Sequence, residues 1–362
     1  MFSASDSRFM QRALELAARA LDATPNPRVG CVIVRGGDVL GEGYTQAAGS
    51  NHAEVEALQD ARRKGHDVQG ATVYVTLEPC SHFGRTPPCA RALIEARVAC
   101  VVAAVEDPNP LVSGGGLQML RAAGIDARCG LLRQEAVEAN IGFFSRMTRG
   151  RPWVRVKLAG SLDGRSALEN GVSQWITGEA ARADVHGWRA RACAVLTGIG
   201  TVLADDPRLT VRLVPVSRQP LKVVADSGLR VPETAHLFDD GQVLLAAARA
   251  DEQKVRRLES RGVQVLRCPG ADGRVDLFAL LAELGRRGIN ELHVEAGAAL
   301  SGAIVAQGLA DEILLYQAPV FLGPGRALLD LPRLEDLAPV RRWQVRESRS
   351  IGGDLRILAR PQ

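Results

Sequence analysis

The sequence predicts an α/β protein built from two successive domains. Predicted strands and helices alternate along most of the chain, which is the pattern of layered α/β domains. A length of 362 residues is enough for two compact domains of ordinary size. The segment 149–152, RGRP, interrupts the alternation near the middle. We therefore expect one domain over residues 1–148 and a second over residues 149–362.

The first half begins with an amphipathic helix. Apolar residues recur at helical spacing over 5–22. Two apolar runs then flank Gly36-Gly37, which predicts a β-hairpin. The remaining elements are predicted, in order, as a helix at 52–64, a strand at 72–77, a helix opened by Pro87 and Pro88, a strand at 100–105 and a helix at 130–148.

The second half repeats the alternation, which predicts a second α/β domain with a sheet of its own. Short apolar runs predict strands at 153–159, 193–198, 221–226, 242–247, 263–268, 291–297 and 312–321. Helices are predicted near 178–190, 251–260, 275–287 and 298–307.

Composition and charge limit the possible classes of function. The chain has 45 basic and 41 acidic residues, a net charge of +4, without a block of like charges that would indicate a nucleic-acid partner. It lacks a run of about 18 apolar residues, and its start lacks the pattern of a signal peptide. Seven cysteines, an odd number, favour a reducing compartment, where spaced cysteines mark metal or catalysis more often than disulfides. We therefore expect a cytoplasmic protein that binds neither nucleic acid nor membrane.

A candidate zinc site is formed by His52, Cys80 and Cys89. Catalytic zinc usually has three protein ligands and keeps its fourth position for water. Cys89 lies in the first turn of a predicted helix, where the positive partial charge favours the thiolate that zinc requires. Glu54, two residues after His52, would stand beside the metal and carry protons to and from its water. We expect one zinc ion per chain.

The order H-x-E, then P-C, then a second cysteine is the pattern of zinc nucleobase deaminases. In the shortest form of this pattern two residues separate the cysteines. Here eight residues intervene, which excludes the plain cytidine and tRNA-adenosine deaminase pattern as the closest match. His82, between the cysteines, could be a further ligand, but we expect it to face the substrate. The other five cysteines lie alone in apolar strands or turns and are expected to be structural.

Two other functions fit part of these patterns. A nucleic-acid deaminase would gather basic and aromatic residues near its pocket, whereas only 4% of the residues are aromatic. A structural zinc site in a binding module would have four protein ligands, which here requires His82. In the second half, Gly198-Ile199-Gly200 begins like a dinucleotide fingerprint, but the third glycine is missing, so a Rossmann fold is not predicted. A symmetric homo-oligomer is expected on base rates.

Several motifs resemble the family of bacterial bifunctional riboflavin biosynthesis proteins, in which a pyrimidine deaminase is fused to a reductase. Three segments resemble the deaminase domain of the family: TPNPRVGCVIV (24–34), HAEVEAL (52–58) and LEPCSHFGRTPPC (77–89). Four segments resemble its reductase domain: VKLAGSLDGR (156–165), SQWIT (173–177), TGIGTVLADDPRLTVR (197–212) and VEAGAAL (294–300). The resemblance implies a three-layer, cytidine-deaminase-like N-terminal domain and a dihydrofolate-reductase-like α/β C-terminal domain.

The resemblance also implies two successive reactions on a small phosphorylated pyrimidine. The first domain would hydrolyse the 2-amino group of 2,5-diamino-6-ribosylamino-4(3H)-pyrimidinone 5′-phosphate. The second would use NADPH to reduce the ribosyl chain, giving 5-amino-6-(5-phosphoribitylamino)uracil. Asn26 and His82 would contact the substrate in the first domain. Asp107 and Asn109 could line the same pocket or serve only as turn residues.

In the second domain the resemblance implies a cofactor set and a substrate set. NADPH would be bound by Ala159, Trp175, Thr201, Asp205, Ser227, Gly297, Ala298, Ala299, Leu300, Ser301, Gly302 and Ala303. The substrate would be bound by Ser173, Arg189, Leu209, Arg212 and Glu295. The two arginines suit the 5′-phosphate by their charge. Lys157 is the candidate proton donor.

Overall fold

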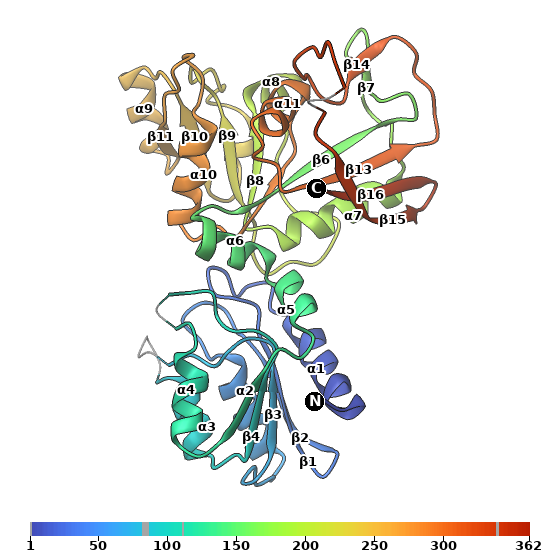
Figure 1. Cartoon of the computed structure of the whole chain (residues 1–362). Helices are drawn as coiled ribbons and strands as arrows, with labels where there is room; N and C mark the ends of the chain where they lie inside the picture. Colours follow the sequence, from blue (N-terminus) through green and yellow to red (C-terminus); the bar gives the residue numbers. More distant parts are fainter. Residues whose placement is uncertain (1, 82–86, 111, 338–339) are drawn as a thin grey trace. The chain divides into compact units, whose positions relative to one another are not determined.

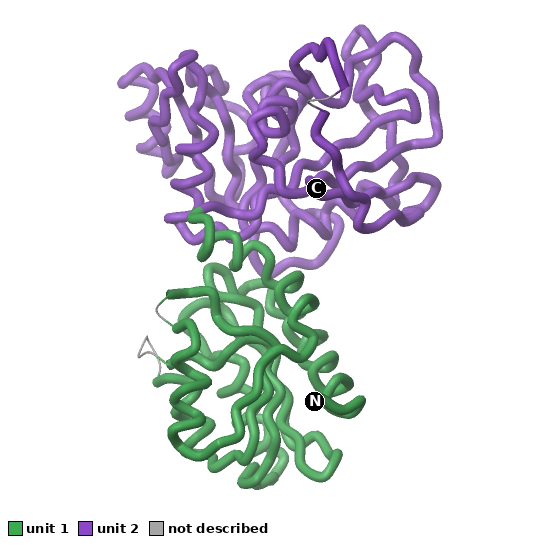
Figure 2. The backbone as a smooth tube through the Cα atoms, in the orientation of Figure 1, with its two compact units in different colours: residues 1–150 green, residues 151–362 purple. Residues whose placement is uncertain are grey.

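The computed structural model describes residues 2–81, 87–110, 112–337 and 340–362 and divides the chain into two compact units. The division falls between Gly150 and Arg151, inside the segment that interrupts the predicted alternation (Figure 2). Each unit has its own sheet and its own apolar core.

Unit 1 contains a five-stranded sheet in the order β2-β1-β3-β4-β5. Its strands are β1 (Gly30–Arg35), β2 (Asp38–Tyr44), β3 (Thr72–Val75), β4 (Cys100–Ala103) and β5 (Asp126–Cys129). β1 runs antiparallel to β2 and β3, whereas β3, β4 and β5 run parallel. The start of β1 and the ends of β2, β3 and β4 therefore lie along the same edge of the sheet.

Helices cover both faces of this sheet (Figure 1). On one face, α1 (Ala4–Ala17) packs on β1 and β3 and contacts α5 (Arg133–Ala139). On the other face lie α2 (Ala53–Arg63), α3 (Cys89–Glu95) and α4 (Gly115–Ala122). The three-layer α/β domain predicted for the first half is confirmed, although α4 and β5 were not among the predicted elements.

Glycines in β2 bring α2 very close to the sheet. A Cβ added at Gly41 would lie 2.3 Å from the carbonyl oxygen of Ala57, and one added at Gly43 would lie 2.5 Å from that of Ala53. Both alanines are fully buried. Because neither side of the contact has a larger side chain, the position of α2 is fixed, and so is that of His52 at its N-cap.

The single helix predicted over 130–148 is two helices, α5 and α6 (Ile141–Arg149). The break occurs at Asn140, whose φ of −119° and ψ of 22° are not helical. The Asn140 side chain accepts a hydrogen bond from the backbone N–H of Arg28 at 2.7 Å and donates one to the Arg28 carbonyl at 2.8 Å. This long-range pairing has no counterpart in the helical periodicity of the sequence.

Unit 2 contains a nine-stranded sheet in the order β11-β10-β9-β8-β12-β6-β13-β16-β15. Its strands are β6 (Trp153–Ser161), β8 (Ala194–Gly198), β9 (Leu221–Ala225), β10 (Val243–Ala247), β11 (Gln264–Arg267), β12 (Glu291–Val294), β13 (Glu312–Ala318), β15 (Trp343–Ile351) and β16 (Asp354–Pro361). Neighbours from β11 to β13 run parallel, and β16 and β15 extend the sheet antiparallel. A separate antiparallel pair joins β7 (Arg165–Leu168) to β14 (Gly325–Ala327).

Helices also cover both faces of the second sheet. They are α7 (Glu179–Arg191), α8 (Ile199–Asp205), α9 (Glu252–Glu259), α10 (Leu277–Arg286) and α11 (Ala298–Ala306), with the short 3₁₀ helix η1 (His236–Phe238). Because strand side chains alternate between faces, Val223 packs in the cluster that includes α10 and α11, and Val224 packs in the cluster that includes α8 and α9. The predicted α/β class is confirmed for unit 2. None of the helices in the described part of the chain has the length and apolarity needed to span a membrane.

Candidate functional site

Several loops of unit 1 meet at one edge of its sheet. The loop that contains Asn26 leads into β1, and His52 follows β2. Cys80 follows β3, Cys89 begins α3, and Asp107 follows β4. The strand directions bring these segments together, although they are far apart in the sequence.

The three predicted zinc ligands lie in one cluster. The Nδ1 atom of His52 lies 3.6 Å from the Sγ atom of Cys80 and 3.3 Å from that of Cys89. All three ligand atoms lie within 4.8 Å of one another. A tetrahedral zinc ion, with bonds of about 2.0–2.3 Å to nitrogen and sulfur, fits ligand atoms at such separations.

Hydrogen bonds in the cluster favour a thiolate. The side chain of Cys89 and its backbone N–H, 3.2 Å from the Cys80 sulfur, together with nearby His52 outweigh burial and lower the pKa of Cys80. One histidine and two cysteines form a donor set typical of catalytic zinc when the fourth position stays open. The residues present therefore fit the predicted metal.

Glu54 lies in the first turn of α2, beside this cluster. Only 3% of the residue is exposed. Burial and the neighbouring Cys80 raise the pKa of Glu54 to about 7. A carboxyl group with such a pKa can both accept and donate a proton near neutral pH.

Of the two predicted substrate contacts in unit 1, Asn26 lies within the described residues. His82 lies outside the described residues. Asn26 is half-buried, and its backbone N–H donates to the carbonyl of Ala23 at 2.8 Å. Its side-chain amide has no hydrogen-bond partner among the residues that the structure describes, so it is available to a ligand.

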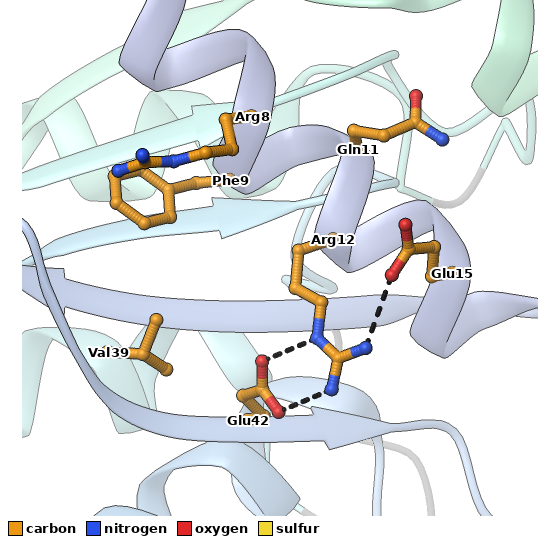
Figure 3. Close-up of a pocket in the computed structure, with 7 residues that line it drawn as sticks. All are labelled: Arg8, Phe9, Gln11, Arg12, Glu15, Val39 and Glu42. Atoms are coloured by element: carbon orange, nitrogen blue, oxygen red, sulfur yellow. Dashed lines mark hydrogen bonds and ion pairs between the residues drawn. The ribbon is translucent and has the colours of Figure 1, made fainter.

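A surface pocket of about 410 Å³ lies elsewhere in unit 1, between α1 and β2 (Figure 3). It is lined by Arg8, Phe9, Gln11, Arg12, Glu15, Val39 and Glu42. The guanidinium of Arg12 pairs with Glu42 at 2.7 Å and with Glu15 at 3.2 Å, so its charge is already engaged by carboxylates of the pocket. The pocket contains none of the predicted site residues.

In unit 2, the predicted substrate residues Arg189 and Glu295 form a bidentate ion pair. Arg189 lies on α7, and Glu295 directly follows β12. The Nη2 atom of Arg189 lies 2.8 Å from one carboxylate oxygen, its Nε pairs with the other, and its Nη1 donates to the Thr210 carbonyl at 2.9 Å. Burial would raise the pKa of Glu295, but Arg189 outweighs it and lowers the pKa.

Lys157, on β6, lies in the electrostatic field of this ion pair. Burial lowers the pKa of its ammonium group, the charge of Glu295 raises it, and the charge of Arg189 lowers it further. Within the described ranges the ammonium group has no hydrogen-bond or ion-pair partner. It is therefore free to interact with a bound ligand.

Two histidines that were not among the predicted site residues, His186 and His293, lie beside the same groups. The Nδ1 atom of His186 accepts a hydrogen bond from the backbone N–H of Arg212 at 3.0 Å. Burial, with Arg189 and Arg212, lowers the pKa of His186 to about 4. His293 is fully buried, and its Nε2 atom lies 3.4 Å from the Glu295 carboxylate. No local sequence pattern marks His186, because its partner Arg212 comes from a separate segment.

The remaining predicted substrate residues have different environments. Arg212 is exposed, and its Nη1 atom donates to the Thr210 hydroxyl at 3.3 Å. Leu209 is buried and has a left-handed φ of 55°. Ser173 is half-buried in the segment before α7.

Two helix starts meet where the predicted NADPH motifs lie. Gly198 is the N-cap of α8, and Gly297 is the N-cap of α11. A Cβ added at Gly297 would lie 3.9 Å from the Thr201 hydroxyl, and one at Gly198 would lie 3.4 Å from Leu300. Because β8 and β12 are parallel neighbours, both helices begin at the carboxyl-terminal edge of the sheet. Backbone N–H groups in this position can bind phosphate.

Other predicted cofactor residues have internal contacts. The Ser301 hydroxyl donates to the Ala296 carbonyl at 3.2 Å, and a Cβ added at Gly302 would lie 2.1 Å from the Asp330 carbonyl oxygen. The Ser227 hydroxyl accepts from the Val275 N–H at 3.1 Å. These three residues therefore also have structural roles.

Some predicted cofactor residues make no hydrogen bond or ion pair that links them to the N-termini of α8 and α11 among the described residues. Ala159 is half-buried on β6. Trp175 is 70% exposed and lies under the guanidinium of Arg182, and Asp205 is exposed at the end of α8. Over the described ranges, no hydrogen bond or ion pair connects Trp175, Asp205 or Ser227 with Thr201 or Gly297.

A three-layer unit with a His-Cys-Cys cluster beside a buried glutamate, followed by a largely parallel α/β unit, defines a chain of the deaminase–reductase class. Comparisons with known families agree with this class. Residues 3–105 match the cytidine and deoxycytidylate deaminase zinc-binding region, and residues 152–357 match the RibD C-terminal domain.

The chain belongs to the RibD family of riboflavin biosynthesis proteins. It is 47% identical to RibD of Escherichia coli strain K12 over 97% of this chain and 98% of that protein, and 45% identical to RibD of Haemophilus influenzae over 100% and 99%. The solved structure of Acinetobacter baumannii RibD is 42% identical, with a TM-score of 0.90 over 99% of both chains. A Thermotoga maritima protein, described as a diaminohydroxyphosphoribosylaminopyrimidine deaminase and 5-amino-6-(5-phosphoribosylamino)uracil reductase, is 32% identical, with a TM-score of 0.89 over 99% of both.

Proposed function

We propose that unit 1 removes the 2-amino group of 2,5-diamino-6-ribosylamino-4(3H)-pyrimidinone 5′-phosphate by hydrolysis. Unit 2 then reduces the ribosyl chain of the product with NADPH, giving 5-amino-6-(5-phosphoribitylamino)uracil. The observation that carries the proposal is the His52, Cys80 and Cys89 cluster beside Glu54, in one chain with a reductase unit. Membership of the family and the activities named for the Thermotoga maritima relative support the two-step sequence.

In unit 1, His52, Cys80 and Cys89 hold one zinc ion per chain. Zinc, when bound, supplies Lewis-acid activation of the water that attacks the ring carbon. Glu54 takes a proton from that water and delivers it to the ring nitrogen. It then takes the second proton from the new hydroxyl group on the ring carbon and delivers it to the 2-amino group, which leaves as ammonia while the carbonyl forms. Its burial beside the cluster keeps this proton transfer away from bulk solvent. Asn26 and His82 hold the pyrimidine.

In unit 2, the N-terminal N–H groups of α8 and α11 bind phosphate groups of NADPH, with Thr201 and Gly297 at their junction. The other residues of the predicted cofactor set complete this site. NADPH supplies a hydride to C1′ of the ring-opened, imine-like sugar.

The substrate of unit 2 lies against Arg212, Glu295 and Lys157 in this proposal. Lys157 donates the accompanying proton, because its ammonium group lies near the Glu295 charge and has no partner in the described part of the chain. Since Arg189 is engaged by Glu295 and Thr210, the exposed Arg212 is the better contact for the 5′-phosphate. Ser173 and Leu209 line the remainder of the substrate site.

We further propose that the chain works in the cytoplasm as a homo-oligomer. Its seven cysteines form no disulfide, which suits a reducing compartment. Closed symmetric assemblies are the common state of soluble enzymes.

The decisive experiment is incubation of the purified chain with the diaminopyrimidinone phosphate, with and without NADPH, followed by mass spectrometry. The deaminated ribosyl product should form without cofactor, and the ribityl product only with it. An intact diamino substrate after incubation without NADPH would contradict the proposal for unit 1. Accumulation of the deaminated product in the presence of NADPH would contradict the proposal for unit 2.

A further inference from the structure

Glu78, two residues before the zinc ligand Cys80, is a buried carboxylate with an unusual set of partners. One carboxylate oxygen accepts hydrogen bonds from the backbone N–H groups of Asp107 at 3.1 Å and Gly114 at 2.9 Å. The other accepts from Gly116 at 2.9 Å and Leu117 at 3.1 Å. Only 3% of the residue is exposed. A carboxylate with two acceptor oxygens satisfies four backbone donors, of which those of Asp107, Gly116 and Leu117 belong to buried residues.

These hydrogen bonds join two segments that flank the metal cluster. The Glu78 backbone also belongs to this link, since its N–H donates to the Val105 carbonyl at 2.9 Å at the end of β4. Gly116 and Leu117 lie in the first turn of α4, so Glu78 accepts from N–H groups that have no acceptor within that helix. The segment after β3 is therefore held against both the segment after β4 and the start of α4.

The two segments are also in direct steric contact. A Cβ added at Gly116 would lie 1.8 Å from the Pro79 carbonyl oxygen, and one added at Gly115 would lie 2.8 Å from the Ser81 hydroxyl. The residues before and after Cys80 thus touch the start of α4. The Cys80 carbonyl accepts from the Ala90 N–H at 3.2 Å, which fixes the same loop against α3.

We propose that Glu78 is a positioning residue for the deamination site, which sets the places of Cys80, Asp107 and Gly114. This inference rests on the proposed function, because Cys80 is taken there as a zinc ligand. Glu78 has no part in proton transfer, since backbone donors occupy both of its oxygens. Replacement of an outer group that orients a metal ligand typically lowers metal affinity by about 10–100-fold.

The test is Glu78→Gln in the full chain, with Glu106→Gln as the matched control. The glutamine keeps the size of the side chain but replaces one acceptor oxygen by an NH₂ group that faces N–H donors. In a chelator competition, we expect the zinc affinity of the variant to be about 10–100-fold lower than that of the wild type. We also expect amide hydrogen exchange of Gly116 and Leu117 to become faster. The exposed Glu106 lies one residue before Asp107, so its variant should match the wild type in both measurements.

A second pair of variants covers the case in which Glu78→Gln does not fold. Gly116→Ala leaves the carboxylate intact but forces α4 away from Pro79, and it should weaken zinc binding in the same direction. Gly115→Ala meets only the Ser81 side chain, which can rotate, and should weaken it less. Reduction of the deaminated ribosyl intermediate by NADPH, a reaction of unit 2, should stay at the wild-type rate in all four variants.

Wild-type zinc affinity together with wild-type amide protection in Glu78→Gln would overturn the positioning role. If Glu78→Gln does not fold, wild-type zinc affinity in Gly116→Ala would overturn it. Failure of the proposed function is distinguishable, because it would appear as absence of zinc and of deamination in the wild-type chain. In that case the amide exchange of Gly116 and Leu117 still decides whether Glu78 holds α4.

Discussion

At the scale of single residues, the two units place a buried carboxyl group in opposite electrostatic surroundings. Glu54 lies beside the sulfur of Cys80, and burial raises its pKa to about 7. Glu295 is paired with Arg189, which lowers its pKa despite burial. Glu54 is thereby suited to carry a proton, and Glu295 to remain a fixed negative charge.

Glu54→Gln should lower the rate of deamination by about 10²–10⁴-fold, the usual contribution of a positioned acid–base group. The variant should retain zinc, since Glu54 is not one of the three clustered ligands. Both quantities can be measured on one preparation, by product analysis and by metal analysis. Glu56→Gln, in the same helical turn, is the matched control and should stay active, because glutamine can still accept the hydrogen bond that Asn51 donates. Robust deamination by Glu54→Gln would contradict the proton-transfer role.

His186 should make the folding stability of unit 2 depend on pH. Its pKa is lowered from 6.5 to about 4 in the folded chain, so between these values the unfolded chain binds the proton more readily. Stability is therefore fully present above about pH 6.5 and is lost as the pH falls toward about 4. The steepest loss is about 1.4 kcal/mol per pH unit.

Denaturant midpoints of the unit 2 transition at pH 7 and pH 5 measure this effect. His186→Gln, which cannot take up the proton, should show a smaller drop than the wild type, whereas the exposed His66→Gln should not differ from it. An equal drop in His186→Gln and the wild type would show that other groups are responsible.

The cluster of His52, Cys80 and Cys89 could be predicted from sequence because a metal site requires particular residue types, and these three stand in a known order. Glu78 could not, since its partners are backbone N–H groups, which every residue except proline carries. The same reason applies to His186, whose partner is the backbone of Arg212.

At the scale of elements, small residues decide how closely a helix approaches a sheet. α2 lies on β2 through glycine and alanine, whereas α10 meets its sheet through leucines that form a wider layer. The first kind of contact admits no additional carbon, and the second can adjust by side-chain rotation.

Gly43→Ala should destabilise unit 1 by about 1–3 kcal/mol, because the new Cβ overpacks the contact with Ala53 at the start of α2. Since His52 is the N-cap of this helix, zinc affinity should fall as well. Gly187→Ala is the contrasting variant. Gly187 is exposed within α7, and an added Cβ meets nothing within 4 Å, so alanine should stabilise the helix by up to about 1 kcal/mol. Thermal unfolding measures both changes, and a neutral Gly43→Ala would refute the close-packing argument.

Elements with strong apolar periodicity could be predicted, and those without it could not. The buried strands β8, β9 and β10 are mostly apolar, with Thr197 in β8 and Lys222 in β9 as exceptions, and they agree with the prediction. β15 was not predicted because its side chains are mostly exposed and polar, so its pairing with β16 defines it. The helix over 130–148 was predicted as continuous because the break at Asn140 depends on Arg28.

At the scale of the whole molecule, separate cores predict separable activities. Among the described residues, each unit has apolar clusters of its own. We therefore expect unit 2 to keep its fold when unit 1 loses its metal.

Removal of zinc by a chelator should abolish deamination and leave the reduction of the deaminated intermediate unchanged. Two parallel assays on one chelated sample, one with the diamino substrate and one with the deaminated intermediate plus NADPH, measure this. Return of deamination after zinc is added back is the control for irreversible damage. Loss of both activities on chelation would mean that the metal also supports unit 2.

The tie between Asn140 and Arg28 spans 112 residues of the chain. During synthesis, which proceeds from the N-terminus at about 5–20 residues per second, all three proposed zinc ligands leave the ribosome well before Asn140 does. The hydrogen bonds that hold the loop containing Asn26, between Arg28 and Asn140, cannot form until Asn140 emerges. On the proposed assignments, the nascent chain can bind its metal before the substrate pocket around Asn26 is complete, and unit 1 becomes active only when nearly all of its 150 residues have been made.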